Sequence, residues 1–130
     1  MPVAVTATER EWVSVELTGA MTLEDVRAAI PKVEAQLREP RLSIFVDTRG
    51  ITKPLRILEV AATVNLLRRF PALGVKRIAV ITGGGIAHEI SKAFAAFASV
   101  LNLRVKVFVH GEDARVWLSS SGSSGAFWRR

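Results

Sequence analysis

Residues 43–53, with the sequence SIFVDTRGITK, decide the fold of this chain. A run with strong strand preference leads to Asp47, and Gly50 then begins a short basic segment that is typical of a loop. A buried strand that ends in polar residues is a common binding edge of an α/β domain. We therefore expect a sheet-and-helix scaffold built around a central strand at residues 42–47, which is apolar enough to be covered on both faces.

The sequence before the central strand predicts a hairpin and a helix. Residues 3–8 and 12–18 alternate between apolar and polar side chains and are joined by a short polar link, which favours two antiparallel strands. Residues 19–20, Gly-Ala, are expected to end the second strand. A helix is then expected at residues 22–38, opened by a capping box and kinked or broken near Pro31, because proline removes a backbone donor.

The sequence after the central strand predicts three further helices and two strands. Pro54 stands at a favoured first helical position. The expected elements are a helix at 54–70, a strand at 77–82, a helix after the glycines at 83–85, a strand at 104–109 and a helix at 112–118. Their inward side chains are expected to be Ile57, Ala61, Val64 and Leu67, then Ile90, Phe94, Phe97, Ala98 and Leu101, then Ala114, Trp117 and Leu118. The order ββαβαβαβα implies a mostly parallel sheet of four or five strands, with an N-terminal antiparallel hairpin and about four helices.

The composition indicates one folded domain, residues 1–118, followed by a flexible Ser/Gly-rich tail, residues 119–130. The chain has 130 residues, of which 49% are hydrophobic, enough for a substantial core. No apolar run approaches the roughly 18 residues that span a bilayer, and no secretory signal opens the sequence. We therefore expect a soluble, cytoplasmic protein with no membrane insertion. The absence of cysteine excludes disulfides and a cysteine nucleophile.

The net charge of +6 is concentrated in the second half of the chain. The first 65 residues carry eight basic and nine acidic side chains, whereas the remaining 65 carry ten and three. Such asymmetry is compatible with an anionic partner. However, several of these cations surround an expected helix end, where they complement the helix dipole. No interleaving of aromatic and basic residues accompanies the charge, so we do not expect a nucleic-acid partner.

Four segments together resemble the STAS domain superfamily, and in particular the SpoIIAA-like (STAS/SEC14) bacterial proteins. They are the opening hairpin with Gly19, VDTRGIT at 46–52, RIAVI at 77–81 and EDARVWL at 112–118. The resemblance covers residues 3–118 and implies an α/β SpoIIAA-like sandwich without established catalysis. It implies a regulatory or binding module that acts through protein–protein contacts.

The resemblance also directs attention to the start of the second helix. Anti-sigma factor antagonists of this kind carry a phosphorylatable serine there. In this sequence the matching segment lies near residues 54–57, and Arg56 occupies the acceptor position. The resemblance therefore implies a module without the usual phosphoacceptor, although the hydroxyl of Thr52 is nearby.

The segment that follows the central strand holds the first group of candidate binding residues. Asp47 is expected at the carboxyl end of the strand, where it orients a ligand or simply fixes the loop ahead of Gly50. Arg49, Lys53 and Arg56 suit a phosphate or carboxylate if they face one crevice, and are otherwise solvated surface charges.

A second group lies before the third helix. Gly83, Gly84 and Gly85 resemble a phosphate-cradling turn, because bare backbone amides at a helix start attract anions. The turn lacks the spacing of a dinucleotide fingerprint and the lysine of a P-loop, so a plain strand-to-helix connection is the alternative. His88 follows in the first turns of the helix and completes this candidate group.

The sequence contains no catalytic or metal-binding pattern. His88 and His110 are expected near the ends of adjacent elements, but no ligand spacing supports a metal site. Ser91, His88 and Asp47 form a Ser-His-Asp set only on paper, because Ser91 is not on a Gly-x-Ser-x-Gly elbow. We therefore predict neither an enzyme nor a cofactor.

Two functions remain open at this point. The first is a module that contacts another protein through residues 47–56 and the start of the second helix. The second is a carrier or sensor of a small anionic or lipid-like molecule, held between residues 47–56 and 83–88. A closed apolar cavity, for example beneath Phe94 and Phe97, favours the carrier. A filled core with an exposed apolar helix face favours protein contacts, and the edge hairpin makes a homodimer plausible.

Overall fold

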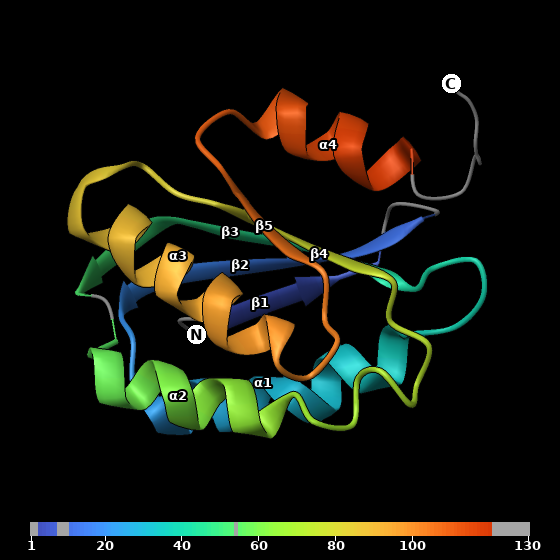
Figure 1. Ribbon diagram of the computed structural model, residues 1–130, viewed down its shortest axis with the longest axis horizontal. Coiled ribbons are helices and arrows are strands. Elements are labelled where there is room, and N and C mark those ends of the chain that lie inside the picture. The colour runs from blue at the N-terminus through green and yellow to red at the C-terminus, as the bar shows by residue number, and fades with distance from the viewer. Residues whose placement is uncertain (1–2, 8–10, 54, 121–130) are drawn as a thin grey trace.

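The computed structural model describes residues 3–7, 11–53 and 55–120 and has the predicted order of elements (Figure 1). The elements are β1 (Val3–Thr6), β2 (Trp12–Ala20), α1 (Leu23–Gln36), β3 (Ser43–Lys53), α2 (Ile57–Leu66), β4 (Arg77–Ile81), α3 (Gly85–Ser99), β5 (Val105–Phe108) and α4 (Gly111–Ser120). Within this described part, no helix is both long and apolar enough to cross a membrane.

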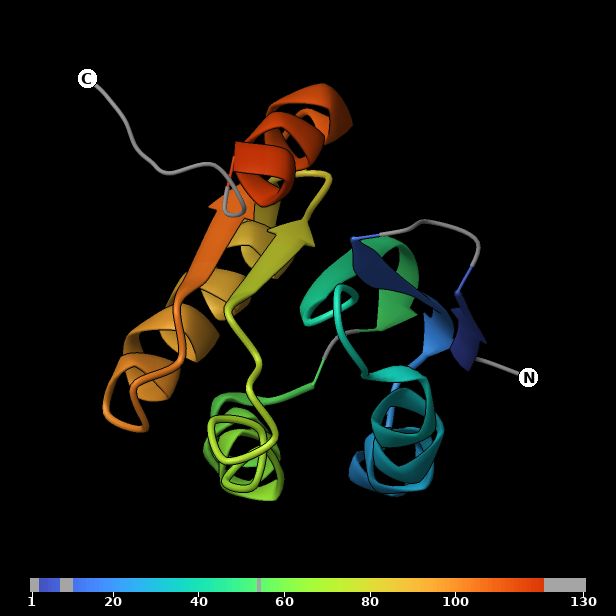
Figure 2. The ribbon, with the colours of Figure 1, turned by 90° about the vertical axis from the view of Figure 1, so that its right-hand side faces the viewer.

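The strands form one mixed sheet in the order β1-β2-β3-β4-β5. The antiparallel hairpin is confirmed by the pairing of β1 with β2, and every other neighbouring pair is parallel. Helices α1, α2 and α3 cover one face, whereas α4 lies on the other (Figures 1 and 2). The crossover helices on one face and the C-terminal helix on the other thus bury both faces of β3, as its continuous apolar run predicts.

Two hydrophobic cores flank the sheet, because side chains alternate along each strand. On the side of α1–α3, the larger core contains Val13, Ile44 and Val80. On the side of α4, Phe45 and Ile81 belong to a smaller core. The predicted inward residues of the last helix are confirmed, since Ala114 and Leu118 are fully buried and Trp117 packs against the same cluster.

The expected loop after the central strand is in fact strand. β3 continues to Lys53 and β2 continues to Ala20, so the predicted ends at residues 47 and 18 are wrong. The two strands keep pairing, with register shifts on either side of the pairs Thr18↔Gly50 and Gly19↔Ile51. Gly50 allows the close approach: a Cβ there would lie 2.8 Å from Cγ2 of Thr18. The glycine that suggested a turn therefore serves packing between strands.

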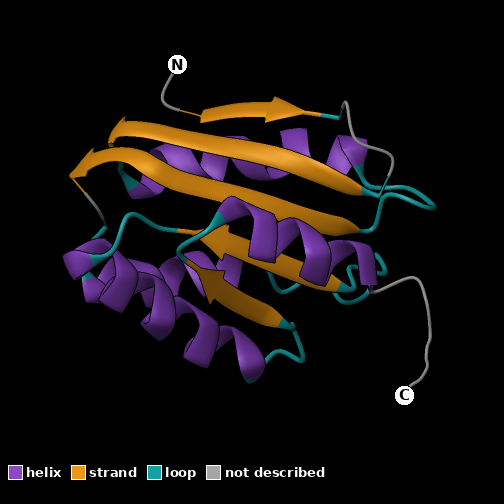
Figure 3. Ribbon diagram, turned by 90° about the horizontal axis from the view of Figure 1, so that it is seen from above, coloured by secondary structure: helices purple, strands orange, loops and turns teal. Residues whose placement is uncertain are grey.

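This extension splits the sheet at its carboxyl end. The pairing of β3 with β4 ends at Asp47↔Ile81, whereas β3 remains paired with β2 as far as Lys53. Figures 2 and 3 show the end of β3 bending away from β4. Residues 48–53 therefore form a two-stranded extension with the end of β2, called here the overhanging ribbon. Beside the end of β4, where β3 no longer pairs, side chains of the helices border the sheet.

The first helix confirms the predicted start and corrects its course. Thr22 Oγ1 accepts a hydrogen bond from Asp25 N, and Asp25 Oδ2 accepts one from Thr22 N, both at 3.1 Å. α1 is continuous through Pro31, so the break considered there is wrong, and the helix ends at Gln36 rather than at residue 38. A tertiary core that holds the helix on both sides of the proline compensates for the lost donor.

The later elements are close to the predicted ones, with differences of a few residues. α2 begins at Ile57, where Glu59 Oε1 accepts a hydrogen bond from the backbone N of Arg56, and ends at Leu66 in a series of turns. The predicted helix start at Pro54 lies outside the described residues. β4 and β5 are each one or two residues shorter than expected, and α4 extends to Ser120, two residues into the predicted tail. The remaining tail also lies outside the described part.

Two predicted inward positions are wrong. Ala61 is exposed, because the buried stripe of α2 runs through Val60 and Thr63 instead. Phe97 is 40% exposed, whereas Phe94 packs against the larger core. The predicted inward positions Val64, Leu67 and Ala98 are buried, so each error concerns one residue at the side of an otherwise correct stripe.

Candidate functional site

Asp47 and Arg49 form a closed pair on the face of the sheet that α4 covers. Asp47 Oδ1 accepts hydrogen bonds from Arg49 N and Nε, both at 3.0 Å, and Oδ2 accepts one from Nη2 at 2.8 Å. This bidentate contact is the main reason why the pKa of Asp47 lies below its usual value and the pKa of Arg49 above. Arg115 of α4 also lowers the pKa of Asp47 and stands over the ring of Phe45 at 5.6 Å. Both oxygens of the Asp47 carboxylate thus already accept hydrogen bonds from Arg49.

The next residue of β3 points to the opposite face. Thr48 lies on the side of α1–α3, and its hydroxyl donates a hydrogen bond of 2.6 Å to the carbonyl oxygen of Ile81. This bond joins β3 to the end of β4 one residue beyond their last ladder pair. The segment predicted as one binding loop is therefore divided by the pleat of a strand between two faces.

The basic residues of the predicted cluster make separate contacts within the chain. Arg49 is engaged by Asp47, while the side chain of Arg56 is 87% exposed and its Nε lies 3.7 Å from Glu59 Oε1. Lys53 and Thr52 are exposed at the end of the overhanging ribbon. An anion site at these residues stays a prediction.

The glycine-rich turn is organised around a buried threonine. Thr82 Oγ1 lies 2.9 Å from His88 Nδ1 and accepts a hydrogen bond of 3.4 Å from Gly84 N. Gly84 and Gly85 have φ values of +95° and +66°, which favour glycine, although a Cβ at Gly83, Gly84 or Gly85 would meet open space. These contacts give the turn a structural role, and its role as an anion cradle stays a prediction.

The contacts of the described residues do not assemble the catalytic set. His88 contacts Thr82 and Asp47 contacts Arg49, so neither is directed at Ser91 in a hydrogen-bonded triad. In the same part of the chain, no three His, Asp or Glu side chains are grouped closely enough to hold a metal ion.

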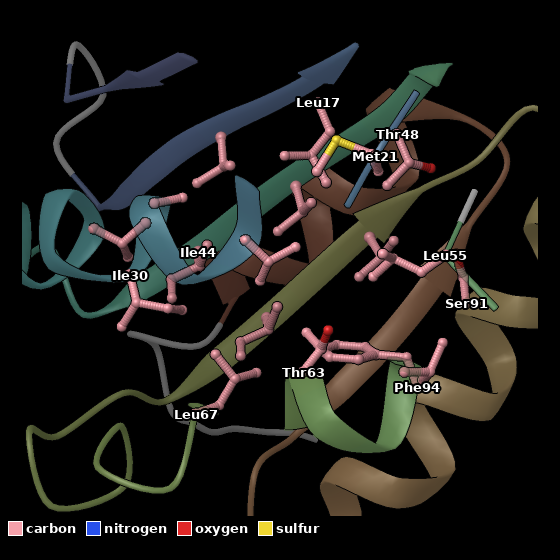
Figure 4. A pocket seen from close by; sticks show the side chains of 18 of the residues that line it. Leu17, Met21, Ile30, Ile44, Thr48, Leu55, Thr63, Leu67, Ser91 and Phe94 are labelled. Carbon is pink, nitrogen blue, oxygen red and sulfur yellow. The ribbon is translucent and has the colours of Figure 1, made fainter. Parts of the chain in front are cut away.

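An apolar cavity of about 170 Å³ lies between the sheet and helices α1, α2 and α3 (Figure 4). β2, β3 and β4 form one wall, and side chains of all three helices form the others. The described lining side chains are apolar except for the hydroxyls of Thr48, Thr63 and Ser91, and none carries a charge. The cavity is partly open to solvent. Phe94 lines it as expected of a cavity beneath α3, whereas Phe97 does not.

The split in the sheet accounts for the position of this cavity. Lining residues at the amino ends of the strands, such as Ile44 and Ile78, are buried. Ile51, Leu55 and Ile90, near the carboxyl end, keep part of their exposure. The opening therefore lies where β3 departs from β4 and where α2 and α3 begin, and this edge adjoins both predicted groups of binding residues.

The sequence analysis considered a cavity beneath Phe94 and Phe97 but did not predict one, although one signal was present. Thr63 and Ser91 occupy the buried sides of apolar helices, where aliphatic residues are the rule. Hydroxyls at such positions indicate either an internal hydrogen bond or a polar feature of a pocket. Periodicity alone does not distinguish a helix face that packs fully from one that lines an empty space.

Comparison with known proteins agrees with this architecture. The family model described as SpoIIAA-like matches residues 12–119. An uncharacterized DUF3478-family protein with a SpoIIAA-like fold from Shewanella loihica PV-4 is similar at 19% identity and a TM-score of 0.60, over 89% of this chain and 91% of that one.

A second solved structure, the anti-sigma factor antagonist SpoIIAA in its unphosphorylated form, is similar at 15% identity and a TM-score of 0.60, over 90% of this chain and 96% of that one. At such identities the two structures show the fold alone, and no curated protein gives a match. Because the family model spans most of the sequence, this chain belongs to the SpoIIAA-like family.

Proposed function

We propose that this chain is a non-catalytic binding module that senses or carries a small apolar molecule in the cavity beneath its sheet. The observation that carries the proposal is the cavity itself. Protein interiors are packed about as densely as organic crystals, and voids larger than a water molecule are few. An apolar space of about 170 Å³ in a 130-residue chain is therefore large enough to admit a small molecule and supports a binding role.

The size of the cavity supports a compact ligand. An engineered cavity of about 150 Å³ with Leu, Ile and Phe walls stays dry and binds benzene. At about 24 cal/mol per Å³, a closed cavity of 170 Å³ would cost about 4 kcal/mol of folding stability, which is an upper limit for a space that is partly open to solvent. Since small domains are stable by only about 5–15 kcal/mol, a molecule that fills this space has a large effect on the fold.

The position of the cavity narrows the alternatives drawn from the sequence. It borders the edge at residues 47–56 and 83–88 but extends inward from it, under the helices. Its described lining has no charge to balance an anion, and an isolated buried charge is very costly. The ligand proposed for this space is therefore neutral and mainly apolar, in place of the anionic molecule considered for the edge.

Contact with another protein is a second candidate function, favoured by one exposed side chain. Leu58 is 85% exposed in the first turn of α2. SpoIIAA, which shares this fold, is an anti-sigma factor antagonist. The resemblance described for the sequence places the phosphoacceptor segment of such proteins near residues 54–57, at this helix start. Leu55, three residues earlier, lines the cavity. A ligand that contacts Leu55 and a partner protein that contacts Leu58 would thus bind to residues only three positions apart in the chain.

Thermal unfolding with small apolar probes tests the proposed function. Saturating toluene is expected to raise the Tm of the wild-type chain, because a ligand that binds only the folded state stabilises it. Val15→Phe, which fills the cavity, is expected to remove the shift, whereas Val116→Phe, the same change on the exposed surface of α4, is expected to keep it. If toluene does not change the Tm of wild type, the proposal is wrong.

A matched surface variant separates the two candidate functions. Leu58→Ser removes an exposed apolar side chain without entering the cavity. The variant is expected to keep the toluene-induced Tm shift. Loss of a defined partner from the variant in native mass spectrometry, with the Tm shift unchanged, would support protein contact at α2 as a separate activity.

A further inference from the structure

One hydroxyl in the cavity wall has no hydrogen-bond partner. Thr63 on α2 is only 8% exposed, and its Oγ1 is buried without a partner among the described residues. Among the residues that the structure describes, the other buried side-chain N or O atom without a partner is Glu34 Oε2, which does not line the cavity. The buried hydroxyl without a partner thus belongs to the wall of the cavity.

The orientation of Thr63 is unusual for a threonine inside a helix. Such hydroxyls commonly bond to a carbonyl oxygen three or four residues earlier. In Figure 4 the oxygen of Thr63 instead points from α2 toward the sheet, among the other lining side chains. A buried hydroxyl without a partner destabilises a protein, and valine would fill the same volume at no such cost.

Thr48 provides an internal comparison. It lines the same cavity, but its hydroxyl already donates to the carbonyl oxygen of Ile81 at 2.6 Å. Thr48 therefore has a structural bond within the fold, whereas the bonding capacity of Thr63 is unused. A hydroxyl both donates and accepts, so it suits a ligand hydroxyl or a ligand carbonyl.

We propose that the cavity selects a neutral, mainly apolar molecule that carries one hydroxyl or carbonyl oxygen, and that this oxygen hydrogen-bonds to Thr63 Oγ1. The inference rests on the proposed function, because it requires that the cavity binds a ligand at all. The apolar walls bury the body of the ligand, and Thr63 fixes its orientation. A site built to hydrogen-bond one polar group discriminates against the analogue that lacks it.

Calorimetric titration of phenol and toluene, two probes of nearly the same shape, tests the inference. The ratio of the two dissociation constants is measured for each variant and compared between variants, and this comparison cancels the different hydration of the free probes. Thr63→Val is expected to shift this ratio about fivefold against phenol, as expected for the loss of one neutral hydrogen bond of about 1 kcal/mol. Thr63→Ser, which keeps the hydroxyl, is expected to retain the wild-type preference.

Thr48→Val is the matched control, because it removes a hydroxyl from the same cavity that is already bonded to Ile81. Its ratio is expected to equal that of wild type. Circular dichroism establishes that each variant is folded before titration.

The possible outcomes separate this inference from the proposed function. If neither probe binds wild type, the proposed function fails and this inference fails with it. If both probes bind but Thr63→Val leaves the ratio unchanged, the cavity binds ligands and the role of Thr63 is wrong. An equal shift in Thr48→Val and Thr63→Val would likewise overturn the specific role of Thr63.

Discussion

Two valines on one strand offer a direct test of whether the cavity is usable space. Val13 and Val15 lie on the same face of β2 and are buried, with 0% and 6% exposure. Val15 lines the cavity and Val13 does not. Replacing each by leucine adds flexibility and loses the same strand preference at both sites, so the remaining difference reports the room around each side chain.

The expected effects have opposite signs. At Val15 the longer side chain extends into empty space and buries additional apolar surface, which is worth up to about 0.8 kcal/mol per methylene-sized extension. At Val13 the same change overpacks a filled core and costs about 1–3 kcal/mol. Val15→Leu is therefore expected to be neutral or slightly stabilising, and Val13→Leu clearly destabilising, by at least about 1 kcal/mol relative to the first variant.

Urea unfolding followed by circular dichroism measures this difference, with the m-value checked for constancy so that a change in midpoint reports stability alone. In thermal scans, 1 kcal/mol corresponds to roughly 3–5 °C in Tm for a chain of this length. Equal destabilisation by the two substitutions would show that the space beside Val15 is not available to a side chain. The cavity argument, and the ligand proposed for it, would then lose their basis.

Three further predictions concern the edge of the sheet. Gly50→Ala is expected to cost about 1–3 kcal/mol in urea unfolding, because its Cβ would lie 2.8 Å from Cγ2 of Thr18, and Thr18→Ala in the same chain should restore most of the loss. Arg49→Met is expected to lower the free energy of unfolding at pH 7 but much less at pH 2. Because the pKa of Asp47 is lowered in the folded state, the pair stabilises the fold above the pKa of the unfolded carboxyl group, and this contribution is lost as the pH falls through the folded pKa. An equal loss of stability at both pH values would contradict an ionic role of the pair. Gly85→Ala is expected to cost about 1–2 kcal/mol because of its φ of +66°, and a Tm equal to wild type would refute that conformation.

The order of elements was predictable because it depends on local patterns. Alternation identified the hairpin, Thr22 and Asp25 identified the first helix start, and the apolar run before Asp47 identified a buried parallel strand. The family resemblance added the topology and is confirmed by the family model. These features reflect residues that are close in sequence, where propensity and capping are informative.

The course of β3 beyond Asp47 was not predictable in this way. Glycine at position 50 and the polar residues around it favour a loop locally, but pairing with β2 keeps them in a strand. The partner residues are more than thirty positions away, and only the register reveals why Gly50 has no side chain. Tertiary pairing overrides local propensity at this position.

The cavity was harder to predict from the sequence than the strands and helices, because an empty volume leaves no periodic pattern of residues. Leu67 and Phe94 occupy helix faces that the sequence pattern treats as core, and no neighbouring residue in the sequence shows that these faces border an empty space. The predicted site residues border the opening but do not line the cavity. The sequence therefore indicates the edge of the sheet, whereas the cavity behind this edge depends on how the helices pack and is seen only in the structure.

The overhanging ribbon of β3 also bears on how the molecule fluctuates. The backbone of residues 48–53 pairs with β2, whereas the ladder to β4 ends at Asp47↔Ile81 and the side-chain bond from Thr48 to Ile81 is added at that end. Segments with fewer tertiary hydrogen bonds open at a lower free energy than the whole fold. We therefore expect amide hydrogen exchange in this ribbon to be faster than in residues 43–47 of the same strand. A boundary in protection at Asp47 would identify a hinge through which a molecule enters without global unfolding.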